Sequence, residues 1–252
     1  MVIAVLNSKG GVGKTTTAVC LAAALAGPRR PVLLVDLDSH AGASHWCGVS
    51  RNQLRPSTAS VLLEKYPILK AIRHTAAPHL DLLTGSLELA NADLALAEVR
   101  GREVALHRML ERIASHYPLV ILDCPPSFSL LAVNAIVAAD GLVVPVVPEA
   151  LPVDALEGLL ASVDRIRSRM QVRAPLAGIV VNQIDPRRGQ HREVIARLRG
   201  EYRDQVCQTE IRWSAAIAAA PEARRPPAPG EVFRRLGAEV LHRLSSSRDG
   251  RG

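Results

Sequence analysis

The sequence predicts an α/β fold, a doubly wound and mostly parallel sheet flanked by helices. Apolar runs without polar alternation are typical of strands buried on both faces, and they occur at residues 2–6, 31–35, 118–122, 141–147 and 176–181. Helical patterns separate these runs, and this alternation is the order that crossover connections in a parallel sheet require. Hydrophobic residues make up 48% of the chain and aromatic residues 3%, so an aliphatic core is expected.

Local signals place the remaining elements. Apolar residues recurring every three or four positions predict helices at 17–26, 58–65, 87–99, 102–116, 130–139, 153–170, 191–202 and 231–244. Gly27-Pro28 ends the first of these helices, and Ser57 is placed to cap the second. Two shorter strands are expected at 79–83 and 206–211.

The whole chain, 1–252, is expected to form a single domain. The Pro/Gly-rich stretch 221–230 is interpreted as a surface loop, because the one helix that follows it cannot form a domain. Residues 245–252 contain no apolar side chain and are expected to be a disordered tail.

Charge and cysteine usage narrow the class of protein. The net charge is +7, and residues 183–252 hold 14 arginines against 9 acidic residues, so the positive charge gathers in the last third. The four cysteines show no CxxC spacing and are expected in the core. Met1 leads into an apolar strand without the charged region of a signal peptide, and no apolar stretch is long enough to cross a bilayer. A cytoplasmic protein is therefore expected.

A glycine-rich loop between the first strand and the first helix predicts a phosphate site. The segment 8–16 fits Gly-x-x-x-x-Gly-Lys-Thr except that Ser8 replaces the first glycine. Backbone amides of such a loop point at a triphosphate, the Lys14 ammonium reaches the β- and γ-phosphates, and the Thr15 hydroxyl binds magnesium. Thr16 is expected at the α-phosphate. The other loop residues expected to contact ATP are Gly10, Gly11, Val12 and Gly13.

Acidic residues follow two other strands. Asp123 ends an apolar run, as a Walker B carboxylate does, and is expected to hold Mg²⁺ through water. Asp36 and Asp38 end the second strand. Because ligands bind at the carboxyl edge of open α/β sheets, these side chains are expected beside the phosphate loop.

These motifs resemble the deviant Walker A family of ParA/MinD ATPases, of the Soj-like small ParA type. The resemblance rests on an extra lysine in the loop, Lys9, and extends over residues 9–16, 35–38, 122–127, 134–135 and 145–158. It implies an ATP-sandwich homodimer in which Lys9 reaches the partner's phosphates, and it gives Asp38 the task of orienting the attacking water. It also places Asn182 against adenine, although a loop-capping role is an open alternative.

The sequence departs from the family pattern in two places. Residues 39–42 read Ser-His-Ala-Gly where the family commonly has Pro-Gln-Gly-Asn, and 211–213 read Ile-Arg-Trp in place of Ile-Pro-Arg. The geometry of the segment after Asp38, the recognition of the purine and the DNA contacts are therefore open.

The expected function is that of a ParA-like positioning ATPase with a low intrinsic rate. It would bind DNA without sequence preference as an ATP dimer on the nucleoid, and segregate or position a plasmid, chromosome or protein assembly. A ParB-like or other cargo-linked protein would stimulate hydrolysis. The candidate DNA contacts are Arg187, Arg188, Arg192, Arg224 and Arg225.

Two alternatives remain. A MinD-like membrane ATPase would need an amphipathic terminal helix, and residues 232–244 do carry an apolar stripe, although the last helix of such a fold needs one for packing. A metabolic enzyme of the same fold is the other alternative. The extra lysine argues against it.

Overall fold

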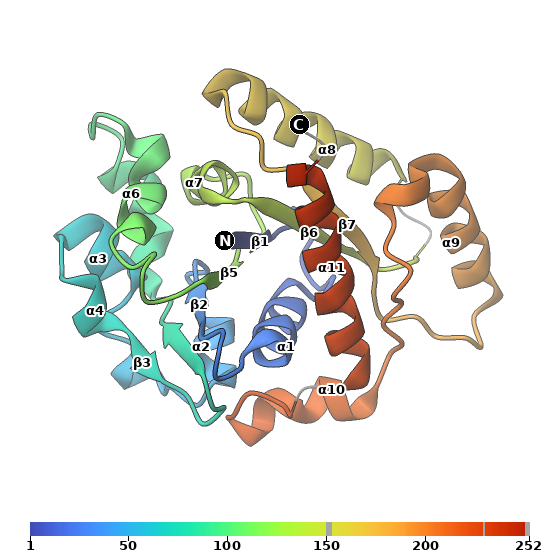
Figure 1. The fold of residues 1–252 in the computed structure, drawn as a ribbon, viewed down its shortest axis with the longest axis horizontal. Coiled ribbons are helices and arrows are strands. Elements are labelled where there is room, and N and C mark those ends of the chain that lie inside the picture. The colour runs from blue at the N-terminus through green and yellow to red at the C-terminus, as the bar shows by residue number, and fades with distance from the viewer. Residues whose placement is uncertain (150–152, 229, 250–252) are drawn as a thin grey trace.

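The computed structural model describes residues 1–149, 153–228 and 230–249, and its centre is a seven-stranded sheet (Figure 1). The strand order is β3-β4-β2-β5-β1-β6-β7, and every neighbouring pair is parallel except β3 with β4. The chain winds from β1 toward β4 and later from β1 toward β7, so the predicted doubly wound sheet is confirmed. The strands are β1 (Val2–Val5), β2 (Val32–Asp36), β3 (Arg73–His74), β4 (Leu80–Leu83), β5 (Leu119–Asp123), β6 (Gly141–Val146) and β7 (Leu176–Val181).

Helices cover both faces of the sheet (Figure 1). Successive residues of a strand point to opposite faces. In β1, Ile3 and Val5 pack with α1 and α11, whereas Ala4 packs with the layer that contains α6, α7 and α8. The α-helices are α1 (Lys14–Leu25), α2 (Gly42–Trp46), α3 (Thr58–Glu64), α4 (Ile68–Ala71), α5 (Ala92–Ala95), α6 (Ala105–Glu111), α7 (Leu130–Ala138), α8 (Val153–Met170), α9 (Gly189–Tyr202), α10 (Ala215–Ala219) and α11 (Glu231–Asp249).

Three expectations about elements need correction. The first helix begins at Lys14, which puts the threonines of the phosphate motif in its first turn. The stretches 87–99 and 102–116 are broken into short 3₁₀ and α segments, and Gly101, with φ of 71°, separates them. The stretch 206–211 forms no strand, because its strand-like pairing in the described part of the chain is limited to the isolated bridges Ile179–Val206 and, just beyond it, Ile184–Arg212. The 3₁₀ turns of the described residues are η1 (Arg51–Gln53), η2 (Leu87–Asn91), η3 (Arg102–Val104), η4 (Arg203–Gln205) and η5 (Ala220–Ala223).

The C-terminal helix is longer than expected. α11 continues to Asp249, so the expectation of a disordered tail at 245–252 is wrong for residues 245–249, and 250–252 lie outside the described residues. Ser245 and Ser246 each donate a hydroxyl hydrogen bond to the carbonyl of His242 within this extension. Its apolar stripe is buried against α1, where Leu25 leaves no room for a Cβ at Gly237.

Two composition-based expectations can be compared with the structure. All four cysteines are buried and free, as expected of core residues. Within the described ranges, no helix is both long enough and apolar enough to cross a bilayer.

Candidate nucleotide-binding site

The glycine-rich loop joins β1 to α1 at the carboxyl edge of the sheet. Gly13 caps α1 with φ of 87°, a left-handed conformation that favours glycine. The first amides of a helix have no partner within the helix, so those of the α1 N-terminus are available to an anion. Lys14 opens the helix with only 7% of its surface exposed, and its Nζ donates to the carbonyl of Lys9 at 2.9 Å. The ammonium therefore lies inside the loop.

The charge of Lys14 is set by two opposing effects. Burial lowers the pKa of Lys14 below its usual 10.5, and the carboxylates of Asp123 and Asp38 oppose this shift. The phosphates of a nucleotide would add negative charge and favour the ammonium further.

Side chains after β7 hold the loop from outside. Asn182 donates from Nδ2 to the carbonyl of Val12 at 2.9 Å, and Gln183 donates from Nε2 to the carbonyl of Gly11 at 2.8 Å. These two hydrogen bonds hold the carbonyl groups of Gly11 and Val12 against the residues that follow β7. A Cβ at Gly13 would lie 2.2 Å from Asn182 Nδ2, so this approach is a second reason for glycine there.

Asn182 thus has a structural role in the chain itself. Its Oδ1 accepts from the backbone N–H of Gln183, so both ends of its amide are used within the chain. Contact with adenine remains a prediction. Gln183 was not predicted as a site residue, because nothing in its sequence neighbourhood marks a glutamine that contacts a loop 172 positions away.

Two acidic residues lie side by side at the carboxyl ends of β2 and β5. Asp36 and Asp123 are register partners, and both are completely buried. Asp36 accepts hydrogen bonds from the N–H and the hydroxyl of Ser44 at 2.9 and 2.7 Å. Burial and the charge of Asp38 raise the pKa of Asp36, and the bonds from Ser44 oppose that increase.

Asp123 differs from Asp36 because neither of its carboxylate oxygens has a hydrogen-bond partner among the residues that the structure describes. Burial and the neighbouring Asp36 raise its pKa well above 3.8, while the nearby Thr15 hydroxyl and Lys14 lower it. An unpartnered buried carboxylate is unstable unless a proton or cation satisfies it. Asp123 and Thr15 therefore fit a magnesium site.

The rest of a magnesium shell would have to come from elsewhere. In the described part of the chain, no group of three or more His, Cys, Asp or Glu side chains is arranged for a metal ion. Mg²⁺ commonly combines one or two protein oxygens with water and substrate phosphates. Asp123, Thr15 and the adjacent phosphate loop match that pattern.

Asp38 follows β2 and is held by the turn after it. Its backbone N–H donates to Asp36 Oδ1 at 3.1 Å, and its own Oδ1 accepts from both the N–H and the Nδ1 of His40, each at 2.9 Å. The chain then enters α2, where a Cβ at Gly42 would lie 3.4 Å from the Thr15 methyl group. Gly42, the last residue of the segment 39–42, thus lies beside Thr15.

Lys9 lies on the outer rim of the loop. Its side chain is 42% exposed, and its Nζ lies 3.7 Å from a carboxylate oxygen of Glu149. The resemblance segment 145–158 continues from Glu149 into residues 150–152, which lie outside the described residues.

The five candidate DNA-contact arginines fall into two groups. Arg187, Arg188 and Arg192 lie at the start of α9, while Arg224 and Arg225 follow η5, and all five are exposed. Asp185 pairs with Arg187 at 3.0 Å and more loosely with Arg188 at 3.9 Å. Arg187 holds the pKa of Asp185 at about 2. Arg192, Arg224 and Arg225 form no ion pair with any described residue.

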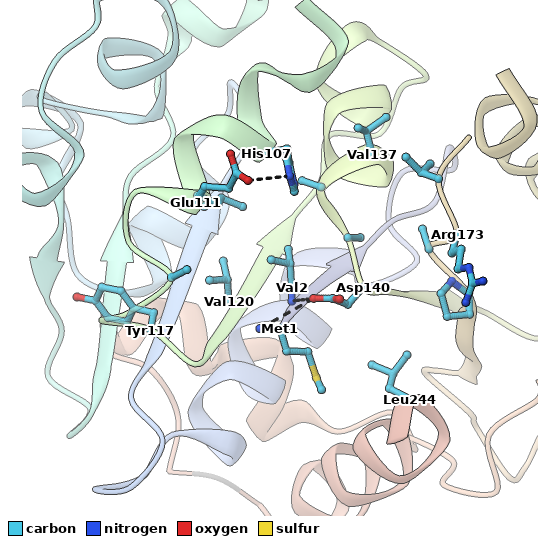
Figure 2. Close-up of a pocket in the computed structure, with 17 residues that line it drawn as sticks. Met1, Val2, His107, Glu111, Tyr117, Val120, Val137, Asp140, Arg173 and Leu244 are labelled. Atoms are coloured by element: carbon cyan, nitrogen blue, oxygen red, sulfur yellow. Dashed lines mark hydrogen bonds and ion pairs between the residues drawn. The ribbon is translucent and has the colours of Figure 1, made fainter. Parts of the chain in front are cut away.

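A separate cavity lies elsewhere. It has a volume of about 470 Å³ and is lined by the amino ends of β1 and β5, by α6 and by the loop before β7 (Figure 2). His107 and Glu111 form an ion pair of 3.4 Å on its wall, and Asp140 accepts from the N–H of Val2. Phosphate-loop residues do not line it, because the loop lies at the opposite, carboxyl edge of the sheet. This cavity is therefore not the nucleotide site.

A parallel, doubly wound sheet with this loop between β1 and α1 defines a P-loop nucleotide-binding protein. A family model described as "AAA domain" matches residues 1–175. The chain is 33% identical to the sporulation initiation inhibitor protein Soj of Bacillus subtilis over 225 residues, 89% of each chain. It is 32% identical to the chromosome partitioning protein ParA of Caulobacter vibrioides over 251 residues, covering 96% of this chain and 94% of the relative. The chain belongs to this AAA-domain family of ParA/Soj-like P-loop ATPases.

A solved structure supports the same fold. The cobyrinic acid a,c-diamide synthase of Mycobacterium smegmatis, with bound ADP and magnesium, superposes with a TM-score of 0.86 at 30% identity. The similarity covers 98% of this chain and 96% of that chain.

Proposed function

We propose that the protein is a ParA-like ATPase that dimerises when it binds ATP. The observation that carries this proposal is the different exposure of two lysines of one loop. Lys14 is buried inside the loop, whereas Lys9 projects from its exposed rim. Lys14 is placed to bind phosphates of its own nucleotide, and Lys9 to meet those held by a second copy. A cation supplied across an interface couples dimerisation to ATP and stabilises transition-state charge.

ATP and Mg²⁺ are the proposed ligands of the loop. Gly10, Gly11, Val12, Gly13, Thr15 and Thr16 would hold the phosphates with Lys14. Thr15 and Asp123 would hold the ion, which neutralises charge on the β- and γ-phosphates. Asp38, next to Lys14 and the magnesium position, belongs to the apparatus that orients the attacking water. We expect the protein alone to hydrolyse ATP slowly, because a partner protein would be needed to stimulate the reaction.

The exposed arginines support a role on DNA. Arg192, Arg224 and Arg225 are available to bind DNA phosphates, and a dimer would present each of them twice. Affinity for a polyanion grows steeply with the number of neutralised phosphates, so the dimer would bind where the monomer does not. The protein would then act in the cytoplasm, on the nucleoid, and a cargo-linked activator would release it by triggering hydrolysis.

Gel shifts with random-sequence duplex DNA test this proposal. We expect retention with ATP and Mg²⁺, little retention with ADP or without nucleotide, and loss of retention as salt rises. The oligomeric state is measured in parallel by light scattering. Salt-insensitive binding, or equal binding in all nucleotide states, would contradict it.

The packing of α11 argues against the alternative of a MinD-like membrane ATPase. The stripe of α11 that could have entered a bilayer packs in the core, where Phe233, Leu236, Val240 and Leu244 are buried. Pelleting with anionic liposomes in ATP, without DNA retention, would revive this alternative.

One observation favours the metabolic alternative, namely the similarity to the solved M. smegmatis synthase. ATP-dependent amide formation on a corrinoid carboxylate, assayed without DNA, would identify this activity. We expect no amide formation, because an amide-forming reaction would give the exposed Lys9 no role.

A further inference from the structure

We propose that Ser44 is a positioning residue for ATP hydrolysis, because its hydroxyl group joins Asp36 to the loop after β4 and so fixes the main chain at Asp38. This inference rests on the proposed ATPase function and deepens it. Asp38 keeps its task of orienting the attacking water, and Ser44 acts through Asp38 from a buried position.

The carboxylate of Asp36 connects Asp38 with α2. Its Oδ1 accepts from the backbone N–H of Asp38 at 3.1 Å, and its Oδ2 accepts from the N–H and the hydroxyl of Ser44 at 2.9 and 2.7 Å. Asp36 and Ser44 are both completely buried, so water is not at hand to replace a lost bond. The two carboxylate oxygens therefore tie the N–H of Asp38 to Ser44.

The loop after β4 confines the other side of Asp38. Ser44 Oγ accepts from the backbone N–H of Gly85 at 2.9 Å. A Cβ at Gly85 would lie 2.6 Å from the carbonyl oxygen of Asp38 and 2.8 Å from Asp36 Oδ1, so only a residue without a side chain can approach this closely. The main chain at Asp38 is thus held at its N–H by Asp36 and at its carbonyl by the approach of Gly85.

The hydroxyl of Ser44 takes part in both of these restraints. A hydroxyl donates one hydrogen bond and also accepts, and this one donates to Asp36 while it accepts from Gly85. An alanine at this position could do neither. Without the hydroxyl, Asp36 would lose one of its donors and the buried N–H of Gly85 would lose its partner, so the turn at Asp38 would be free to shift.

This buried cluster lies at the nucleotide edge of the sheet. Asp36 ends β2 beside Asp123 of β5, its register partner. The helix that carries Ser44 begins at Gly42, where a Cβ would lie 3.4 Å from the Thr15 methyl group. A shift of α2 or of the turn before it would therefore move Asp38 relative to the proposed magnesium residues, Thr15 and Asp123.

The test compares Ser44→Ala with wild type in single-turnover hydrolysis at saturating ATP and Mg²⁺. We expect the rate to fall by about 10-fold or more, because misplacement of a reacting group by about 1 Å can cost about 100-fold. The ATP Kd in calorimetry should stay within about twofold of wild type, as expected when an interaction matters for the chemical step and not for binding.

Two further variants isolate the hydroxyl group from packing. Ser44→Thr keeps the hydroxyl, whereas Ser44→Val has the same branched shape without it. The threonine variant should hydrolyse ATP faster than the valine variant. Equal rates in the two would show that packing at this position, and not its hydrogen bonds, governs hydrolysis, and would overturn the proposal.

Ser60 supplies a matched control. It is also buried, and its hydroxyl accepts from the N–H of Ser57 at 3.2 Å in the capping box of α3. Ser60→Ala should lose stability in urea titrations, as Ser44→Ala does, but should hydrolyse ATP as wild type does. A readout independent of activity is the ¹H–¹⁵N amide signal of Asp38 in the nucleotide-free protein, which should shift in Ser44→Ala and not in Ser60→Ala.

The outcomes separate this inference from the function on which it rests. A wild type that neither binds nor hydrolyses ATP overturns both. A wild type that hydrolyses ATP, with a Ser44→Ala variant of equal rate, overturns only the role of Ser44. An equal loss of rate in Ser60→Ala, or an Asp38 amide signal that does not respond to Ser44→Ala, also overturns that role alone.

Discussion

Asn182 donates its side-chain amide to the carbonyl oxygen of Val12 at 2.9 Å, across 170 residues of the chain. The bond ties the end of β7 to the phosphate loop after β1, with β6 between these two strands in the sheet. A loop built of glycines has many conformations to lose when it binds an anion. Two bonds from β7, through Asn182 and Gln183, reduce that loss by holding the loop in place beforehand.

Replacing Asn182 with Ala should weaken the binding of any polyphosphate. The buried Val12 carbonyl would lose its partner, which costs about 1–3 kcal/mol, so the Kd for ATP and for tripolyphosphate should rise by similar factors in calorimetry. A larger loss for ATP than for tripolyphosphate would instead reveal contact with adenine. The Gln183→Ala variant, lacking the neighbouring bond, provides the comparison.

Substitution of Lys14 and of Lys9 should impair two different steps, ATP binding and dimerisation. Lys14→Ala should abolish ATP binding, because the cation inside the loop is lost. Lys9→Ala should bind ATP near the wild-type Kd and remain monomeric in light scattering. Lys65→Ala and Lys70→Ala, both at exposed positions, serve as controls and should behave as wild type. An ATP-dependent dimer of Lys9→Ala would contradict the trans role of this lysine.

Asp38→Ala should bind ATP and dimerise without turnover. The loss of hydrolysis removes the step that ends the dimer, so the dimer should persist on DNA after free ATP is removed. Fluorescence anisotropy of labelled duplex, followed through a chase with ADP, measures this lifetime. Normal hydrolysis by this variant would remove Asp38 from the proposed mechanism.

Asp123 should make the magnesium-free protein less stable as pH rises. Its pKa is raised well above 3.8 in the folded state, so above that pH the folded chain binds more protons than the unfolded chain. The free energy of unfolding therefore falls as pH increases. Asp123→Asn should remove part of that fall in urea titrations at pH 5 and 8 without metal, and should also abolish stabilisation by Mg²⁺ with ATP. Asp164→Asn, at an exposed carboxylate, should change neither.

Arg224 and Arg225, which form no ion pair with a described residue, should contribute to the salt dependence of DNA binding. The Arg224→Ala/Arg225→Ala double variant should bind random duplex less tightly, and the slope of log K against log salt should shrink by about 0.9 for each DNA phosphate that the variant no longer neutralises. ATP-dependent dimerisation should be unchanged. Arg100→Ala, an exposed arginine outside the last third, is the control. An unchanged slope in the double variant would place the DNA-binding surface elsewhere.

The sequence alone determined the fold class and the phosphate loop. Strands made of continuous apolar runs are stable mainly in a sheet that helices cover on both faces. The phosphate-binding motif lies within nine consecutive residues, 8–16, so it can be recognised from the sequence alone. Asp36, Asp38 and Asp123 were predicted as site residues for a related reason, because strand ends of a parallel sheet meet at one edge.

Only the tertiary structure decided which groups complete the site and what each one touches. The hydrogen bonds of Asn182 and Gln183 to the loop, the unpartnered oxygens of Asp123 and the ring of His40 on Asp38 depend on strand order and side-chain orientation. The same is true of the α11 stripe, whose amphipathic pattern fits either a membrane or a core until its packing on α1 is seen. Local pattern reports which faces are apolar, but not which partner covers them.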